Sequence, residues 1–149
     1  MYRHILIAID GSESSQAAIE HGVALAKVLG ARITGVHAVP DFLPPLDSAF
    51  QSAAFPSREE YVRLAKIEAE GVLAQVSRAC SAAGVACDLA HAVESRPARL
   101  ILAIAAERGC DLICMSSHGR RGLSALLLGS ETQKVLSHGS LPVLVVRAA

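Results

Sequence analysis

Residues 5–30 read ILIAIDGSESSQAAIEHGVALAKVLG. The apolar run at residues 5–9 is typical of a short strand that is buried on both faces. The polar turn Asp10-Gly11-Ser12 ends this run, and the alanine-rich stretch at residues 14–29 predicts a helix that ends at Gly30. A strand, a polar turn and a helix in this order form the repeating unit of layered α/β proteins.

The same unit recurs along the rest of the chain. Further strands are predicted at residues 33–39, 85–93, 111–115 and 142–147, and further helices at 57–83, 96–108 and 130–138. A loop rich in Pro, Ser and Ala, residues 40–57, is long enough to be a functional lid or a poorly ordered excursion. The pattern predicts one α/β domain over residues 1–149, a doubly wound, five-stranded parallel sheet with helices on both faces.

Composition favours a heavily buried domain and argues against two classes of partner. Hydrophobic residues make up 52% of the chain and charged residues 19%, as expected when both faces of a sheet are covered. The longest apolar runs, such as residues 100–106, are too short to span a bilayer, so we expect no membrane segment. Lys and Arg balance Asp and Glu at 14 each and aromatic residues make up 3%, so we expect no nucleic acid partner.

The four cysteines, Cys80, Cys87, Cys110 and Cys114, form no C-x-x-C pair. Three of them lie within apolar stretches. We interpret them as small buried thiols of a protein in the reducing cytoplasm, with metal or redox chemistry as the alternative.

The carboxyl ends of the first and fourth strands are the expected ligand site. In an open α/β sheet, ligands bind in the crevice where the strand order reverses. Both strands end in polar turns that contain glycine, Asp10-Gly11-Ser12 and Ser116-Ser117-His118-Gly119. We therefore expect a site between these two turns.

The segment at residues 116–132, SSHGRRGLSALLLGSET, contains two candidate anion-binding features. Gly119 and Gly122 allow positive φ or close approach of the backbone to a ligand. Gly129-Ser130 stands where a helix begins, and a helix N-terminus offers unpaired N–H groups and a partial positive charge to phosphate. Arg120 and Arg121 add positive side chains beside these features.

A purely structural interpretation of the segment stays open. Ser130 followed by Gln133 has the spacing of a capping box, and glycines after a strand often serve only to turn the chain. The two familiar phosphate signatures, G-x-x-x-x-G-K-[ST] and G-x-G-x-x-G after the first strand, do not occur. Neither a P-loop enzyme nor a typical dinucleotide dehydrogenase is therefore expected.

The chain resembles the universal stress protein family. The resemblance rests on the start Ile-Leu-Ile-Ala-Ile-Asp-Gly-Ser, the segment from Ser116 to Ser130 and the ending Leu-Pro-Val-Leu-Val-Val-Arg at residues 141–147. Nucleotide-binding members carry Gly, two residues, Gly, nine residues, then Gly-Ser or Gly-Thr. Gly119 and Gly129-Ser130 match this spacing, and Ser116 stands where the motif has its first glycine. Serine would be strained there if the position needs positive φ, and would fit if it needs only a small residue.

The resemblance implies an adenine nucleotide α hydrolase-like fold with strand order 3-2-1-4-5 and ATP as the ligand. Carried over residue by residue, it implies that these residues bind the nucleotide: Ala8, Asp10, Val39, Met115, Ser116, His118, Gly119, Arg120, Gly129, Ser130, Glu131 and Thr132. Val39 would act through its main chain. No protein side chain is expected to hold a metal directly, although Mg bound to the nucleotide would lie near Asp10.

Two of these residues have simpler interpretations as well. Asp10 is expected either to tie down the turn before the first helix or to contact nucleotide or its metal. His118 has no evident nucleophile or carboxylate partner in the sequence, which favours a loop-stabilising or ligand-contact role over catalysis.

The resemblance also implies a homodimer through the last strand, Val143, Leu144, Val145 and Val146, which would lie at an edge of the sheet. Coverage of this edge by a neighbouring helix is the alternative. The function expected from the sequence is a cytoplasmic ATP-binding regulatory or stress-response protein with an unknown protein partner. It is not expected to be an efficient enzyme. A dimeric interaction module without nucleotide and a slow ATPase remain the alternatives.

Overall fold

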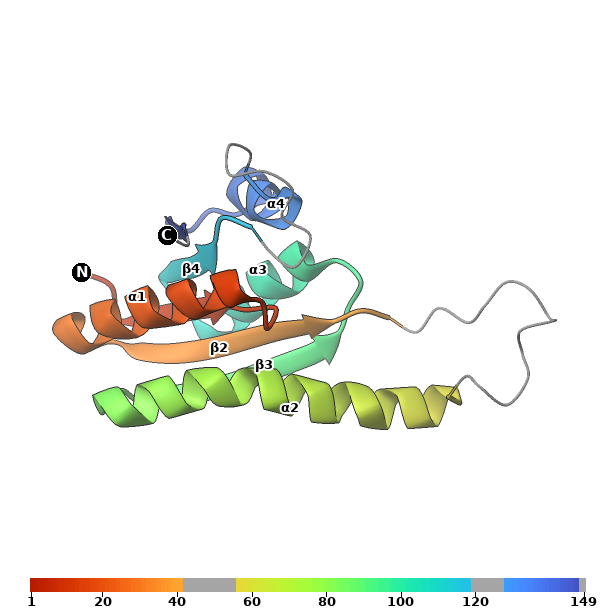
Figure 1. The fold of residues 1–149 in the computed structure, drawn as a ribbon. Coiled ribbons are helices and arrows are strands. Elements are labelled where there is room, and N and C mark those ends of the chain that lie inside the picture. Colours follow the sequence, from red (N-terminus) through yellow and green to blue (C-terminus); the bar gives the residue numbers. More distant parts are fainter. Residues whose placement is uncertain (42–55, 119–127, 148–149) are drawn as a thin grey trace.

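The computed structural model describes residues 1–41, 56–118 and 128–147, and over these residues strands and helices alternate as the sequence predicts (Figure 1). The elements are β1 (His4–Ala8), α1 (Glu13–Leu29), β2 (Arg32–Val39), α2 (Arg58–Ala83), β3 (Cys87–Val93), α3 (Pro97–Arg108), β4 (Leu112–Ser116), α4 (Ser130–His138) and β5 (Val143–Val146). Most of the predicted loop at 40–57 lies outside the described residues. Of the helices described, none combines the length and apolar character needed to cross a lipid bilayer.

The five strands form one parallel sheet in the order β3-β2-β1-β4-β5, which confirms the predicted strand order. The chain adds β2 and β3 on one side of β1 and then crosses to add β4 and β5 on the other. Adjacent strands β1 and β4 therefore flank the point at which the order reverses. Their carboxyl ends form the edge of the sheet where ligands bind in folds of this kind.

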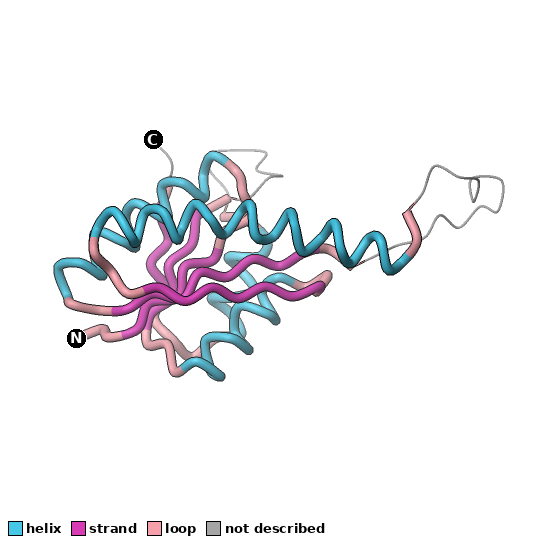
Figure 2. Tube along the Cα trace, turned by 90° about the horizontal axis from the view of Figure 1, so that it is seen from below, coloured by secondary structure: helices cyan, strands magenta, loops and turns pink. Residues whose placement is uncertain are grey.

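Helices cover both faces of the sheet (Figure 2). Alternate residues of β1 point to opposite faces: Ile5 and Ile7 belong to the core shared with α1 and α2, and Leu6 and Ala8 to the core shared with α3 and α4. All five residues of β1 are buried, as the uninterrupted apolar run predicts.

Helix α1 packs very closely against β1 because a glycine faces the strand. A Cβ atom added at Gly22 would lie 2.6 Å from Ile7 Cδ1. The absent side chain lets the helix backbone approach the sheet and fixes the position from which α1 begins, beside the carboxyl end of β1.

The amino edge of the sheet is built from one repeated device. Helices α1, α2 and α3 end at Gly30, Gly84 and Gly109, which have φ of 65°, 69° and 66°. After α2, Val85 N donates to the Cys80 carbonyl (2.9 Å), so the predicted start of the third strand at Val85 is wrong: this residue completes the helix cap and β3 begins at Cys87.

Asp111 does not belong to the fourth strand as the sequence predicted. Its carboxylate accepts hydrogen bonds from Arg3 N (2.8 Å) and His4 N (3.0 Å), which ties the turn before β4 to the start of β1. Strand β4 therefore begins at Leu112 and extends to Ser116.

Candidate functional site

Two turns at the carboxyl ends of β1 and β4 face each other and are joined by hydrogen bonds. Ser14 Oγ, in the first turn of α1, donates to the carbonyl oxygen of His118 (2.7 Å). Ser116 Oγ, at the end of β4, donates to the same oxygen (2.7 Å). The His118 carbonyl thus accepts one hydrogen bond from the start of α1 and one from the end of β4, and it holds the two turns together. The predicted site residues of these turns are neighbours in space.

The turn after β1 is fixed by the Asp10 carboxylate. Asp10 Oδ1 accepts from Ser12 N (2.9 Å) and from Ser15 Oγ (2.6 Å), and Asp10 N donates to Ser15 Oγ (3.1 Å). Gly11 has a φ of 79° in this turn. These bonds show that Asp10 ties down the turn, which is one of the two roles predicted for it; contact with a nucleotide or its metal stays a prediction.

The start of α4 is held against the end of β4. Gly129 N donates to the carbonyl of Ser117 (2.7 Å), and Thr132 Oγ1 donates to the carbonyl of Ser116 (3.0 Å). A Cβ atom at Gly129 would lie only 2.9 Å from the Ser117 carbonyl oxygen. The glycine is therefore required for the close approach of two backbone segments.

The capping box predicted for Ser130 and Gln133 is wrong. Gly129 is the N-cap residue and Ser130 already belongs to the helix. Gln133 N bonds to the carbonyl of Gly129 (2.9 Å), and its side-chain amide donates to the carbonyl of Leu128 (2.8 Å). Because glycine has no side chain to cap the helix, the first N–H groups of α4 receive no side-chain cap.

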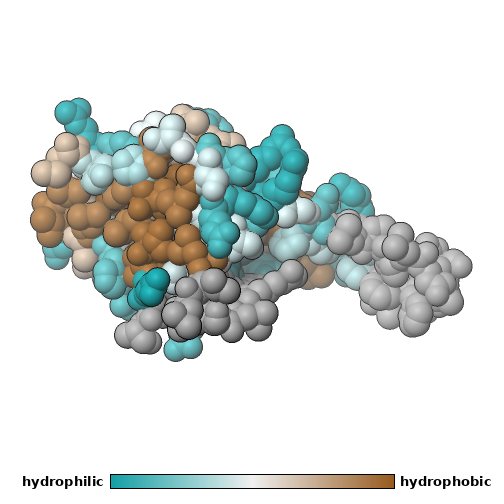
Figure 3. All heavy atoms as spheres, turned by 90° about the horizontal axis from the view of Figure 1, so that it is seen from above, coloured by the Kyte–Doolittle hydropathy of each residue, from teal (hydrophilic) through white to brown (hydrophobic). Residues whose placement is uncertain are grey.

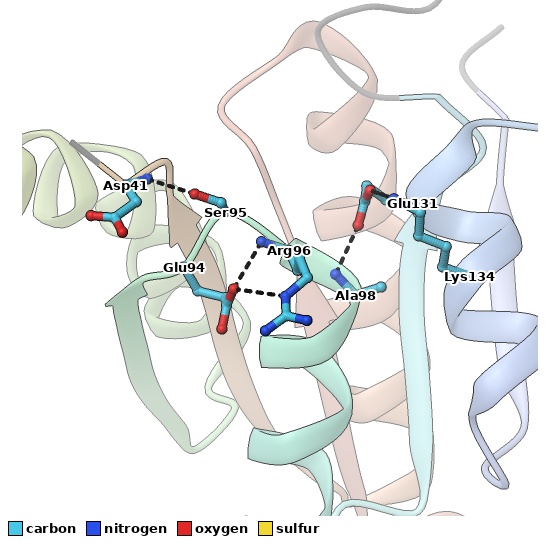
Figure 4. A network of polar contacts seen from close by, with 7 residues as sticks. All are labelled: Asp41, Glu94, Ser95, Arg96, Ala98, Glu131 and Lys134. Carbon is cyan, nitrogen blue, oxygen red and sulfur yellow. Dashed lines mark hydrogen bonds and ion pairs between the residues drawn. The ribbon is translucent and has the colours of Figure 1, made fainter. Parts of the chain in front are cut away.

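The Glu131 side chain points toward Ala98, in the first turn of α3 (Figure 4). Its carboxylate accepts from Ala98 N (2.9 Å), in the first turn of α3, and forms an ion pair with Lys134 (2.6 Å). Both contacts compensate the acidic side chain. The negative charge of Glu131, in the first turn of α4, is therefore shared with Lys134 and with the N-terminus of α3.

Further polar contacts fix the rim of the site between β3 and α3. Glu94 Oε1 accepts from Arg96 N (3.0 Å), and Asp41 N donates to Ser95 Oγ (3.2 Å). These contacts tie the segment after β3 to the end of β2 (Figure 4). The rim is set by short-range side-chain contacts that sequence patterns do not reveal.

Ser116 adopts ordinary extended backbone as the last residue of β4. Among the residues that the structure describes, none other than glycine has a positive φ. The position therefore does not need the left-handed conformation, and the strain considered for serine does not arise. Ala8 and Met115, which are register partners at the ends of β1 and β4, are both buried beneath the turns.

Val39 ends β2, but its main chain points toward β3, because its carbonyl accepts from Glu94 N (2.8 Å). Val36 O bonds instead to Ile9 N (3.0 Å), on the β1 side. Backbone groups alternate in direction along a strand, so Ala38 and not Val39 turns its main chain toward the crevice. The sequence could not indicate this, since the direction depends on the register of the sheet.

His37 is a further residue that sequence reasoning missed at this edge. It is buried, and its Nδ1 donates to the Ile9 carbonyl (2.9 Å) just beyond β1. Its Nε2 is shielded from solvent and has no hydrogen-bond partner within the described part of the chain. Buried polar atoms are usually satisfied, so this acceptor beside the crevice is notable.

His118 shares a hydrogen bond between its Nδ1 and Ser117 Oγ (3.0 Å), and its Nε2 is shielded with no partner among residues 1–41, 56–118 and 128–147. The predicted site residues Gly119 and Arg120, together with Arg121 and Gly122, lie outside the described residues. The described residues include no group of three or more His, Cys, Asp or Glu placed to hold a metal ion.

Strand β5 lies at the edge of the sheet, as the family resemblance implies, and pairs with β4. Val143, Leu144 and Val145 are only partly buried, and Val146 is buried. On the side of the molecule that carries α4 at the top of Figure 1, the surface presents a broad apolar area (Figure 3). This edge is therefore apolar and partly open.

Comparison with known proteins extends over almost the whole chain. The universal stress protein family model matches residues 1–147. The chain is 37% identical to a universal stress protein of Thermus aquaticus, covering 99% of this chain and 100% of that protein. The solved structure of protein MJ0577 of Methanocaldococcus jannaschii is similar with a TM-score of 0.82 and 26% identity, covering 100% of this chain and 98% of that one.

Two more distant structures share the fold and contain adenine nucleotides. One is a universal stress protein in complex with cAMP, with a TM-score of 0.70, 21% identity and 99% of each chain covered. The other, from Arabidopsis thaliana, has AMP bound, with a TM-score of 0.69, 15% identity and coverage of 99% of this chain and 92% of that one. Fold, family model and relatives agree: the chain belongs to the universal stress protein family.

Proposed function

We propose that this protein binds an adenine nucleotide, ATP in the first instance, at the carboxyl ends of β1 and β4. The observation that carries the proposal is the start of α4. Its glycine N-cap leaves the helix N-terminus without a side-chain cap, and Gly129 and Thr132 hold that terminus against the end of β4. The N–H groups of Ser130, Glu131 and Thr132 then suit a phosphate chain.

The residues on the β1 side suit the adenosine part. Ala8 and the Asp10 turn would line the ribose, and the main chain of Ala38 would face the base. Mg carried by the phosphates would lie near Asp10. The solved structures with cAMP and AMP support this choice of ligand class.

The test begins with freshly purified protein. Denaturation and anion-exchange chromatography should release an adenine nucleotide. In parallel, ATP with magnesium at about one hundred times its dissociation constant should stabilise the fold by roughly 2.7 kcal/mol, which raises the melting temperature by several degrees. GTP at the same concentration is the control. The absence of both released nucleotide and an ATP-specific shift would overturn the proposal.

We further propose that the protein acts in the cytoplasm as a dimeric regulatory or stress-response module that pairs through β5. The Pro142 carbonyl accepts from Ile113 N in β4, and the Val146 carbonyl accepts from Ser117 N, just after β4. Because backbone groups alternate in direction along a strand, those of Val143 and Val145 point away from β4. An apolar strand with an outward row of N–H and C=O groups is suited to pairing with a second copy.

The variant Val145→Pro tests this pairing, because it removes one outward N–H and leaves the bonds between β5 and β4 in place. We expect a dimer for the wild type and for the control Val145→Thr, and a monomer for Val145→Pro, by light scattering after size exclusion. A dimer that persists in the proline variant would contradict pairing through this edge.

We propose binding without efficient hydrolysis. Incubation with ATP and magnesium should therefore give little or no ADP. Rapid turnover would identify the protein as an ATPase. Failure to bind nucleotide together with an intact dimer would instead favour an interaction module that uses the same fold without a ligand.

A further inference from the structure

The outward side of α2 carries an apolar row that no described element covers. The opposite side of this helix packs against α1, β2 and β3, with Ala65, Ala69 and Val76 buried. On the outward side, Leu64 is 44% exposed and Ile67 is 55% exposed. Helix α2 runs along the outside of the molecule, at the bottom of Figure 1 (Figures 1 and 2). These two large apolar side chains are therefore placed where another molecule can reach them.

The residues of this outward side recur with the spacing of a helix–helix contact. They form a row, which we call the α2 seam, at positions separated by alternating steps of four and three residues: Glu60, Leu64, Ile67, Gly71, Ala74 and Arg78. Such steps keep side chains in one line along a helix and are the a and d spacing of coiled coils. Ala74 is half-buried and the other five are exposed. The seam is thus acidic at its start, apolar in the middle and basic at its end.

Gly71, in the middle of the seam, is not required by packing within the chain. A Cβ atom there would have no other atom within 4 Å, whereas a Cβ atom at Gly22 would lie 2.6 Å from a side chain of the sheet. Glycine weakens a helix interior relative to alanine, so an exposed one is unfavourable for the helix itself. On an open helix surface, however, it lets a second backbone approach closely.

A second α2 in the antiparallel direction is complementary to the seam in size. When the two seams are centred on each other, Leu64 faces the partner's Ala74 and Ile67 faces the partner's Gly71. By symmetry, each of these contacts occurs twice. A large side chain therefore meets a small residue at every apolar position, which allows close packing of the two helices.

The same antiparallel arrangement is complementary in charge. It places Glu60 opposite the partner's Arg78 at both ends of the seam. Arg78 forms no ion pair with any described residue, and Glu60 forms only a weak one with Arg63 on its own helix, 3.9 Å between exposed side chains. A parallel pair would instead place two glutamates together at one end and two arginines together at the other. Charge thus favours the antiparallel direction.

We propose that α2 pairs with the α2 of a second copy of this chain, antiparallel and along the seam. This surface lies over β2 and β3, at the opposite end of the sheet from β5, so it is separate from the edge proposed for pairing through β5. It does not depend on nucleotide binding. A single pair of helices buries little surface, so the association is weak and is lost at the dilution of a size-exclusion run.

Sedimentation equilibrium of full-length Val145→Pro tests the contact without pairing through β5. We expect the average mass to rise from monomer toward dimer as the protein concentration increases to about 1 mM. Adding Ile67→Glu should weaken this association by about tenfold or more, because it places two charges in the apolar middle of the seam. The control is Val62→Glu, which replaces a similarly exposed apolar residue (49%) on another side of α2 and should leave the association unchanged.

If β5 pairing survives in Val145→Pro, the same concentration-dependent step should run from dimer to tetramer and respond to the same variants. Failure of the β5 proposal is thus distinguishable from failure of this one. No increase in mass with concentration, or an increase that Ile67→Glu does not weaken, would overturn the pairing of α2.

Charge reversal tests the antiparallel direction. In the Val145→Pro background, Glu60→Arg alone and Arg78→Glu alone should each associate several-fold more weakly, because like charges then meet at both ends of the seam. An equimolar mixture of the two variants should regain the original association, since each chain now carries the charges that the other lacks. This recovery would exclude misfolding as the cause of the loss. Single variants that associate as strongly as Val145→Pro itself would overturn the antiparallel seam.

Discussion

The two edges of the sheet are built in different ways. At the amino edge, the three helix ends at Gly30, Gly84 and Gly109 share one left-handed cap and the same pair of backbone hydrogen bonds. At the carboxyl edge, the turns after β1 and β4 differ from each other and depend on particular side chains, among them Asp10 and Ser14.

This difference separates residues that hold the fold from residues that shape a site. A cap made from backbone groups needs only a residue that tolerates positive φ, and space around it; no atom lies within 4 Å of where a Cβ would be at the three cap glycines. The hydrogen bonds that Ser14 and Ser116 donate to the His118 carbonyl instead need particular side chains, one of which comes from a distant part of the chain. Substitutions at the amino edge should therefore affect stability alone, and those at the carboxyl edge ligand binding as well.

Gly129→Val should produce the largest effect and the clearest contrast between the edges. The new side chain would collide with the Ser117 carbonyl and displace the start of α4. We expect at least a tenfold loss of ATP affinity, equivalent to about 1.4 kcal/mol, by isothermal calorimetry. Gly71→Val is the matched control, because Gly71 is exposed on α2 with open space around it. Equal affinity of both variants would place the nucleotide elsewhere.

Gly84→Ala examines the amino edge. Alanine is strained at φ 69°, so the free energy of unfolding should fall by about 1 kcal/mol, with ATP affinity unchanged. Gly30→Ala and Gly109→Ala should give similar losses in urea denaturation. A change in ATP affinity in any of the three would break the division between the two edges.

Ser14→Ala removes one of the two hydroxyls that hold the His118 carbonyl. We expect a loss of about 1 kcal/mol in unfolding free energy and a weaker melting-temperature shift with ATP. Ser81→Ala, on the exposed side of α2, is the control for loss of a hydroxyl. An unaltered ATP response in Ser14→Ala would show that the two turns do not need this link for binding.

The smallest expected effect is a pH dependence at the amino edge. His4 is buried, with Nε2 bonded to Thr34 Oγ1 (2.8 Å) and Nδ1 accepting from Arg32 Nε (3.2 Å). Burial, and next the Arg32 charge, lower the pKa of His4. Below the ordinary histidine pKa of about 6.5, the unfolded chain therefore binds more protons than the folded one, and stability declines as the pH falls toward the folded pKa.

His4→Gln should remove that part of the acid dependence of the melting temperature. The exposed His138 provides the control, since His138→Gln should retain the wild-type dependence. Parallel pH profiles for the wild type and His4→Gln would mean that the decline has another source.

The sequence alone determined the elements of this fold and the edge at which the candidate site lies. Apolar runs, glycine caps and helical periodicity are local properties, so they predicted all nine elements. Two strand boundaries were wrong: Val85 completes the cap of α2, and the Asp111 carboxylate binds the backbone at the start of β1. The strand order came from the family resemblance. The order of elements then implied which strand ends would meet.

Only the tertiary structure decided which way the groups at that edge point and what each of them contacts. The main chain of Val39 faces β3, the Glu131 carboxylate turns to α3, and Gly129 is required by the Ser117 carbonyl. These are contacts set by sheet register and helix packing, and a local sequence pattern does not specify the direction of a backbone group or the neighbour that a side chain meets.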